Sequence, residues 1–225
     1  MLGQKQPFMG TPKHIAISLD DISDWCRKNN ARINEGCERY FSLLNRLLES
    51  QAVLNIPIFT VYLLQENVEK SDDYIIFCDY MADFFSKLPE NAAVSKTKIS
   101  VFGKWYNLPG KAVEALKKAI EETKDYDSFF VNFCINYDGQ EEIVDACKLI
   151  AKHVELGKID PEMITKEIIK ENIYSSYFMP PDVILIYGEE KLTGLLLWDS
   201  VNSKVVFAGK SFMEFEEADV EKFME

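Results

Sequence analysis

Short apolar runs alternate along this chain with stretches in which apolar residues recur at helical spacing. The runs are rich in β-branched and aromatic residues and mostly continuous, which is typical of strands buried on both faces of a parallel sheet. The alternation therefore predicts an α/β fold, a six-stranded, mainly parallel sheet flanked by helices. The predicted strands are 14–19, 56–64, 98–102, 128–137, 182–187 and 204–207, and the predicted helices are 34–54, 72–88, 109–123, 138–155, 160–173 and 216–224.

Composition narrows the class of protein. No linker, repeat or break in composition divides the 225 residues, so we expect one domain spanning residues 1–225. The formal net charge of −12 disfavours nucleic acid as a partner, because neutralising phosphates requires Lys and Arg. There is no apolar run of about 18 residues that could cross a membrane and no apolar leader segment. The five scattered cysteines are typical of reduced thiols in a cytoplasmic protein. With only two histidines, a His-based zinc site or a His-led catalytic triad is not expected.

Three aspartates follow the first predicted strand in the order D-D-x-x-D, namely Asp20, Asp21 and Asp24. Ligands of open α/β sheets bind at the carboxyl ends of strands. Mg²⁺ is usually held by one or two carboxylates together with phosphate oxygens of a substrate. The cluster therefore predicts a magnesium site that binds a phosphorylated substrate. The alternative is an acidic N-cap and first turn of a helix, which the helix dipole also favours.

Four segments resemble, in order and spacing, the motifs of the cis-prenyltransferases, the family of undecaprenyl and dehydrodolichyl diphosphate synthases. The segment PKHIAISLDDISDW is similar to the opening P-K-H-[IV]-A-[IV]-I-M-D-G-N-G-R-W of that family. FTVYLLQENV resembles its L-T-x-Y-A-F-S-x-E-N-W strand and loop. VNFCINYDGQEEIV is similar to L-N-x-A-x-N-Y-G-G-R-x-E-I-V, and DVILIYGEEKLTGLLLW resembles D-L-x-I-R-T-[SG]-G-E-x-R-[IL]-S-N-F-L-L-W.

The resemblance implies one α/β domain, a dimer, a prenyl diphosphate substrate in a hydrophobic tunnel, and Mg²⁺ at Asp20. It leaves peripheral contact with a membrane open. The residues that hold diphosphate in the family are mostly absent, although Trp25 persists. The family's glycines and arginine after Asp20 are replaced by Asp21, Ile22, Ser23 and Asp24. Its later arginines are replaced by Gln140, by Ile186 or Tyr187, and by residues around Lys191. The glutamate with which the partner subunit helps to bind Mg²⁺ in the family corresponds to Lys204 here.

These replacements change the charge expected at the site. Two diphosphates are normally neutralised mostly by bidentate arginines. Here most of those arginines are gone and two carboxylates are added, so a diphosphate should bind only when divalent cations reverse the sign of the charge. The motif D-D-x-x-D binds metal in this way in class I terpene synthases and trans-prenyltransferases, whose helical fold is unrelated.

The first functional hypothesis is an Mg²⁺-dependent enzyme that ionises one allylic prenyl diphosphate to a terpene or a short prenyl chain. Asp20, Asp21 and Asp24 would be its metal-binding and catalytic residues. For each aromatic residue taken alone, ordinary core packing is the simpler interpretation. The substrate-binding candidates near the diphosphate are Trp25, Arg32, Asn67 and Asn136, with Lys191 as a further cation, and those around the hydrocarbon are Tyr40, Phe77, Met81, Phe84 and Phe85.

The second hypothesis is a catalytically silent partner subunit of a heteromeric cis-prenyltransferase that makes polyprenyl diphosphate. The arginine-free segment LIYGEEKLTGLLLW resembles such partners, whereas the retained Asp20 and the missing C-terminal R-x-G motif do not. The chain would then form a heterodimer with a full-motif relative rather than a homodimer.

A third hypothesis is an ordinary long-chain synthase that acts alone. It is disfavoured because the site for its second substrate has lost its arginines. Four further acidic residues could join a metal site, namely Glu66, Asp138, Glu141 and Glu142. A solvated helix N-terminus explains the last three more simply.

Overall fold

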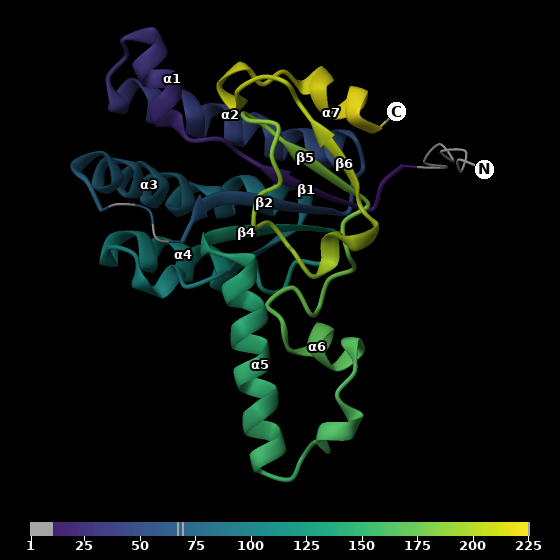
Figure 1. Ribbon diagram of the computed structural model, residues 1–225. Helices are drawn as coiled ribbons and strands as arrows, with labels where there is room; N and C mark the ends of the chain where they lie inside the picture. The colour runs from purple at the N-terminus through teal and green to yellow at the C-terminus, as the bar shows by residue number, and fades with distance from the viewer. Residues whose placement is uncertain (1–10, 67, 69, 225) are drawn as a thin grey trace.

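The computed structural model describes residues 11–66, 68 and 70–224, and it is built on one six-stranded sheet (Figure 1). The strand order is β3-β4-β2-β1-β5-β6, and every neighbouring pair is parallel. The predicted α/β fold is thereby confirmed, with a sheet that is parallel throughout. The strands are β1 (His14–Ser18), β2 (Ile58–Gln65), β3 (Thr97–Phe102), β4 (Phe129–Tyr137), β5 (Val183–Ile186) and β6 (Lys204–Phe207).

Both faces of the sheet are covered, because the strands have apolar side chains on both sides. One face packs against α1 to α4 and α7 in the larger core cluster. The other face packs in a smaller cluster against the chain between α6 and β6. The helices are α1 (Ile22–Asn29), α2 (Ile33–Val53), α3 (Asp72–Ser95), α4 (Gly110–Thr123), α5 (Gly139–Glu155), α6 (Lys166–Asn172) and α7 (Glu217–Met224).

Two predicted helices differ from the observed ones. Helix α3 continues past its predicted end at 88 and contains Pro89, because its buried face continues through Phe85, Pro89 and Ala92. The predicted helix 160–173 is broken, since Ile164 is extended and Thr165 caps a separate helix by accepting a hydrogen bond from the Ile168 amide at 3.4 Å.

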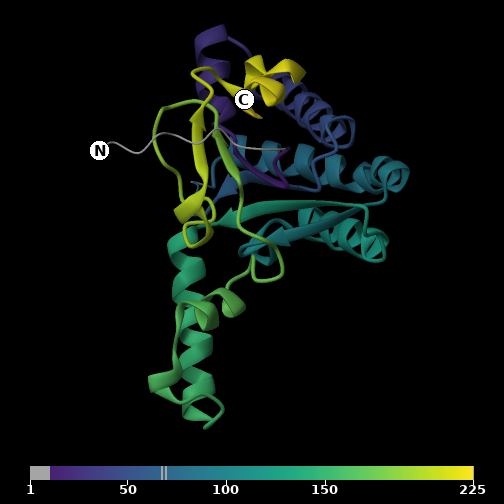
Figure 2. The same ribbon diagram turned by 90° about the vertical axis from the view of Figure 1, so that its right-hand side faces the viewer.

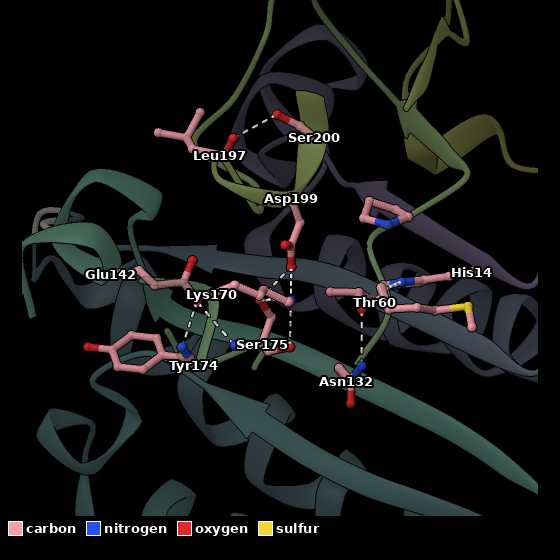
Figure 3. Close-up of polar contacts among 12 residues, drawn as sticks. His14, Thr60, Asn132, Glu142, Lys170, Tyr174, Ser175, Leu197, Asp199 and Ser200 are labelled. Carbon is pink, nitrogen blue, oxygen red and sulfur yellow. Dashed lines mark hydrogen bonds and ion pairs between the residues drawn. The ribbon is translucent and has the colours of Figure 1, made fainter. Parts of the chain in front are cut away.

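Helix α5 and the returning segment with α6 form an arm that projects from the sheet (Figures 1 and 2). A buried polar network attaches this arm to the body (Figure 3). The carboxylate of Glu142 accepts hydrogen bonds from the amides of Tyr174 at 2.9 Å and Ser175 at 3.3 Å. Asp199 accepts from the Ser175 hydroxyl at 2.7 Å and from Lys170 at 2.6 Å.

Because all strands are parallel, their carboxyl ends lie at one edge of the sheet. Asp20 follows β1, Glu66 follows β2, Gly188 follows β5 and Lys210 follows β6. This edge is therefore where the fold brings together polar residues that are far apart in the sequence. None of the helices in the described part of the chain combines the length and the apolar composition needed to cross a membrane.

Candidate functional site

The D-D-x-x-D aspartates lie at the junction between β1 and α1. Asp21 is the N-cap of α1, where its side chain accepts a hydrogen bond from the Ser23 amide at 2.8 Å. Asp24 is exposed in the first turn and forms an ion pair with Arg27. The capping alternative drawn from the sequence therefore describes the local role of Asp21, because a carboxylate satisfies an unpaired amide at a helix start.

Asp20 has a different environment from the other two aspartates. Its Oδ1 accepts a hydrogen bond of 2.7 Å from the amide of Phe212, 192 residues away in the sequence. Gly188 packs against its side chain with a φ of 85°, and a Cβ added to this glycine would lie 2.6 Å from the Asp20 Cβ. Glycine is thus needed at 188 both for the backbone conformation and for the space that Asp20 occupies.

A polar cavity of about 580 Å³ opens beside the three aspartates, between α1 and the ends of β5 and β6. Its described lining contains five acidic residues and three lysines, and it contains no arginine. Two of the lysines are already paired, Lys191 with Glu189 at 2.6 Å and Lys210 with Asp219 at 2.7 Å. The charged lining residues are Asp20, Asp21, Asp24, Glu189, Glu214, Lys28, Lys191 and Lys210.

An apolar cavity of about 210 Å³ adjoins the polar one, and Leu19, Asp20, Asp21 and Gln65 line both. Its walls come from the first turns of α1, from α2, from the end of β2 and from the start of α3. The hydroxyl of Tyr40 stays protonated here, because burial and then the charges of Asp20 and Asp21 raise its pKa well above the ordinary value. The apolar lining includes Ile22, Ile33, Tyr40, Leu63, Leu64, Val68, Tyr74 and Phe77.

The predicted residues near the diphosphate divide into those at the cavities and those elsewhere. Trp25 lines the polar cavity. Arg32 is the N-cap residue of α2 and lines neither cavity. Asn136 adopts a φ of 47° and donates to the Lys104 carbonyl at 2.9 Å, so its amide nitrogen is engaged away from both cavities. Asn67 lies outside the described residues.

The predicted hydrocarbon-binding residues also divide. Tyr40 and Phe77 line the apolar cavity. Met81 and Phe85 are fully buried core residues, and the Phe85 ring packs on Phe133 with centroids 4.8 Å apart. Phe84 lines a separate groove between α2 and α3. A role for Met81, Phe84 and Phe85 in binding hydrocarbon stays a prediction.

Several residues of the site were not expected from the sequence. Lys28 lies one turn beyond Asp24 on α1, so the helical spacing was a usable signal. Lys210, Ser211 and Glu214 follow β6, a strand expected from its apolar residues but not expected to contribute to the site. Phe212 contributes through its backbone amide, for which the sequence gives no signal.

A Mg²⁺ ion at this site could take all its ligands from the protein, or it could take some from the protein and the rest from a bound diphosphate and water. Within residues 11–66, 68 and 70–224, no three His, Cys, Asp or Glu side chains lie close enough together to hold a metal ion. Asp20 and Asp21, however, line the boundary of both cavities. Because Mg²⁺ often takes only one or two protein carboxylates and completes its coordination with phosphate and water, these two residues could hold it together with a diphosphate. Three-carboxylate binding that includes Asp24 stays a prediction.

Residues 20–225 match a family model described as "Putative undecaprenyl diphosphate synthase". The chain belongs to the cis-prenyltransferase family. This match begins at Asp20 and includes every strand after β1.

Individual relatives support the same assignment. The chain is 33% identical over 214 residues to a tritrans,polycis-undecaprenyl-diphosphate synthase (geranylgeranyl-diphosphate specific) of Methanocaldococcus jannaschii, covering 87% of this chain and 72% of that protein. It is 29% identical over 213 residues to an isoprenyl transferase of Streptococcus thermophilus, covering 92% of this chain and 86% of the relative. The crystal structure of lavandulyl diphosphate synthase from Lavandula x intermedia with dimethylallyl diphosphate shares the fold, with a TM-score of 0.89, 23% identity and coverage of 95% and 94%.

Proposed function

We propose that this family member is an Mg²⁺-dependent enzyme that ionises a short allylic prenyl diphosphate. The observation that carries the proposal is the junction of a polar and an apolar cavity at Asp20 and Asp21. An amphiphilic ligand with a charged head and a hydrocarbon tail fits such a pair of adjoining cavities. Relatives that act on prenyl diphosphates support the choice of ligand class, since the named relatives include geranylgeranyl-diphosphate-specific and isoprenyl-transferring enzymes.

The charge of the polar cavity supports the dependence on metal. Its five acidic residues and three lysines give a negative lining, and a bare diphosphate would be repelled by it. Bound divalent cations would reverse that sign. When bound, Mg²⁺ would neutralise the charge that develops on the departing diphosphate.

The chain's own residues would place the ligand and protect it. Asp20 and Asp21 line both cavities, so they would lie where the diphosphate meets the hydrocarbon. Lys28 would add a cation in the polar cavity. Tyr40 and Phe77 present aromatic rings to the apolar cavity, where they would exclude water and stabilise a passing carbocation. The volume of about 210 Å³ is below the roughly 300–1,000 Å³ of cavities for drug-sized ligands, which favours a short hydrocarbon.

The test is incubation of the purified chain with Mg²⁺ and geranyl, farnesyl or geranylgeranyl diphosphate, without isopentenyl diphosphate. We expect release of diphosphate and an organic product from at least one substrate, and loss of both in EDTA. Asp20→Asn should lower turnover by about 100-fold or more, because even an outer-shell partner of a metal ligand contributes 10–100-fold. Asn can still accept the Phe212 amide, so the fold should be retained. Absence of any metal-dependent product would contradict the enzyme.

A second candidate, the silent partner subunit, is favoured by a different observation. Within the described lining, Lys191 and Lys210 are neutralised by Glu189 and Asp219, and Asp21 caps α1 with its own carboxylate. Such internal pairing leaves fewer groups free for a substrate. The discriminating result would be a chain that is inert alone but forms a tight heterodimer with an arginine-complete relative from the same source and raises its polyprenyl diphosphate synthesis.

Either candidate would act as a dimer, through the arm and the edge strand β6. Most of the large apolar side chains that are exposed in the described part of the chain lie between Val144 and Phe207. Tyr177 is 82% exposed and Val201 80% exposed, and a dimer contact at this region would bury them. A cytoplasmic location fits the five cysteines, all of which are free. Sedimentation of the purified chain, alone and with the relative, would separate the homodimer from the heterodimer.

A further inference from the structure

The segment 208–215 between β6 and α7, here called the C-terminal strap, runs past the end of β5 to reach Asp20. It begins in register with β5, since the Ala208 amide donates to Ile186 at 2.8 Å and the Gly188 amide donates to Lys210 at 2.9 Å. It then turns so that the Phe212 amide donates to Asp20 Oδ1 at 2.7 Å. The strap therefore fixes one carboxylate oxygen of Asp20.

Asp20 itself lines the polar cavity. A Cβ built on Gly188, which lines that cavity, would lie 3.5 Å from Asp20 Oδ2. Among the described residues, Phe212 is the one hydrogen-bond donor found for the Asp20 carboxylate. The orientation of the free oxygen is therefore set by where the strap holds the Phe212 amide.

Arg39 of α2 holds the strap at the neighbouring residue. Its Nε donates to the Met213 carbonyl at 3.0 Å and its Nη2 donates to the same oxygen at 2.7 Å. The guanidinium carbon also lies 5.7 Å from the ring centroid of Trp25, a residue that lines the polar cavity. Arg39 itself lines neither cavity. One side chain thus connects α1, α2 and the strap.

The strap also has an anchor in the core. Phe212 is fully buried, and its ring contacts Tyr40 with centroids 5.3 Å apart and Tyr187 at 5.5 Å. The aromatic anchor keeps the strap attached when the polar contact is removed. Loss of Arg39 should therefore shift the Met213 carbonyl and the Phe212 amide without unfolding the segment.

We infer that Arg39 is a positioning residue for Asp20, acting through the Met213 carbonyl and the Phe212 amide. The inference rests on the proposed function for its effect on ligand binding, because Asp20 is the carboxylate proposed to hold the metal. Groups that orient a metal-binding carboxylate typically contribute 10–100-fold to metal affinity or activity. Arg39 acts in that way although it does not touch the ligand.

The test compares Arg39→Met with Arg46→Met. Arg46 lies seven residues further along α2 and also makes two hydrogen bonds to the C-terminal region, with Nε and Nη2 each 2.8 Å from a Glu217 carboxylate oxygen. These hydrogen bonds go to α7 rather than to the strap, so Arg46→Met controls for a general loosening of the C-terminal region. Methionine keeps the aliphatic stem in both variants. Arg39→Lys keeps a charged donor but lacks the paired Nε and Nη2 donors of the guanidinium, so it should retain part of the contact that Arg39→Met loses.

Two measurements are made on each variant. The first is hydrogen exchange of the Phe212 amide by NMR, which we expect to be about tenfold faster in Arg39→Met and unchanged in Arg46→Met. The second is calorimetric binding of inorganic pyrophosphate at several Mg²⁺ concentrations. Arg39→Met should weaken the Mg²⁺-dependent binding about tenfold or more, with a melting temperature within error of that of Arg46→Met.

Equal Phe212 exchange rates in the two methionine variants would overturn the inference, and so would equal pyrophosphate affinities. If the unsubstituted chain itself does not bind pyrophosphate with Mg²⁺, the proposed function fails instead. The exchange measurement then still decides whether Arg39 holds the strap against Asp20.

Discussion

The carboxylates that attach the α5 arm and the carboxylates beside α1 differ in how many hydrogen bonds they accept from the rest of the protein. Glu142 accepts a hydrogen bond from the Tyr137 hydroxyl at 2.6 Å. It also accepts two from the amides of Tyr174 and Ser175 (Figure 3). In the described part of the chain, Asp20 has a single donor, the Phe212 amide. Both residues are acidic and both follow a strand, yet only one retains bonding capacity for a ligand.

This difference shows that acidic residues at strand ends do not by themselves identify a site. Burial raises the pKa of Glu142 above its ordinary value, and its hydrogen bonds only partly offset this. Such a group serves the fold, because a buried polar group must be paired inside the protein. A partly exposed carboxylate with an unused oxygen, bordering two cavities, is available for a metal or ligand.

The largest effect on stability is expected from Glu142→Ala. Removing this carboxylate leaves the buried Tyr137 hydroxyl and the amides of Tyr174 and Ser175 without their partner, which should cost about 4 kcal/mol of unfolding free energy. Urea denaturation would measure the loss. Glu142→Gln, which keeps an acceptor, should lose less than half of that amount. A variant as stable as the unsubstituted chain would show that the contrast between the two regions is wrong.

The second prediction concerns the pH dependence of stability. Burial lowers the pKa of His14 to about 4 from 6.5, against the smaller opposing effects of the Met179 carbonyl and nearby carboxylates. The unfolded chain therefore binds a proton between pH 6.5 and 4 that the folded chain excludes. Unfolding free energy should fall by roughly 3 kcal/mol as the pH drops through this window.

The measurement is urea denaturation at a series of pH values. His14→Gln should flatten the curve between pH 6.5 and 4, and the matched control is His153→Gln at the other histidine of the chain. An unaltered slope in His14→Gln would mean that His14 is not kept neutral by the fold.

Asp21 sharpens the comparison, because it has both a structural and a proposed binding role. Asp21→Ala removes the N-cap of α1 and should cost about 1 kcal/mol. Asp21→Ser keeps a good capping group without the charge, so its stability should be within a few tenths of a kcal/mol of the unsubstituted chain. Mg²⁺-dependent pyrophosphate binding should weaken in both variants. If Asp21→Ser binds pyrophosphate as tightly as the unsubstituted chain does, Asp21 serves only as the N-cap of α1 and does not bind the metal.

The smallest effect on stability is expected from Asp24→Asn. Its ion pair with Arg27 is exposed, so its loss should change unfolding free energy by less than about 0.5 kcal/mol. The informative measurement is Mg²⁺-dependent pyrophosphate binding by calorimetry. Weaker binding in this variant would support three-carboxylate metal binding, and unchanged binding would restrict the metal ligands to Asp20 and Asp21.

The sequence was sufficient to predict the strands of the sheet and the acidic residues on one side of the site. Continuous apolar runs separated by amphipathic stretches are local patterns, and they predicted all six strands within two residues at each end. Asp20, Asp21 and Asp24 could be assigned to a strand end for the same reason. The end of α3 could not be predicted from the sequence, because tertiary burial of Phe85 and Ala92 outweighs the presence of Pro89.

The sequence misassigned the acidic start of α5 in part. Asp138 caps the helix as expected, accepting from the Gln140 amide at 2.7 Å, and Glu141 forms an ion pair with Lys104 at 2.9 Å. Glu142, expected to be solvated, is fully buried instead. The returning segment at Tyr174 covers it, and a contact across 32 residues leaves no trace in local spacing.

By itself, the sequence indicated a mainly parallel α/β protein that resembles the cis-prenyltransferases, lacks most of the arginines of their motifs and has two additional aspartates after Asp20. Only the tertiary structure decided which carboxylates are free. Hydrogen-bond satisfaction depends on donors such as Phe212, Tyr174 and Lys170, which fold onto Asp20, Glu142 and Asp199 from distant parts of the chain. Spacing along the chain encodes which face a residue takes, whereas the partners it meets depend on how the strands are ordered and connected.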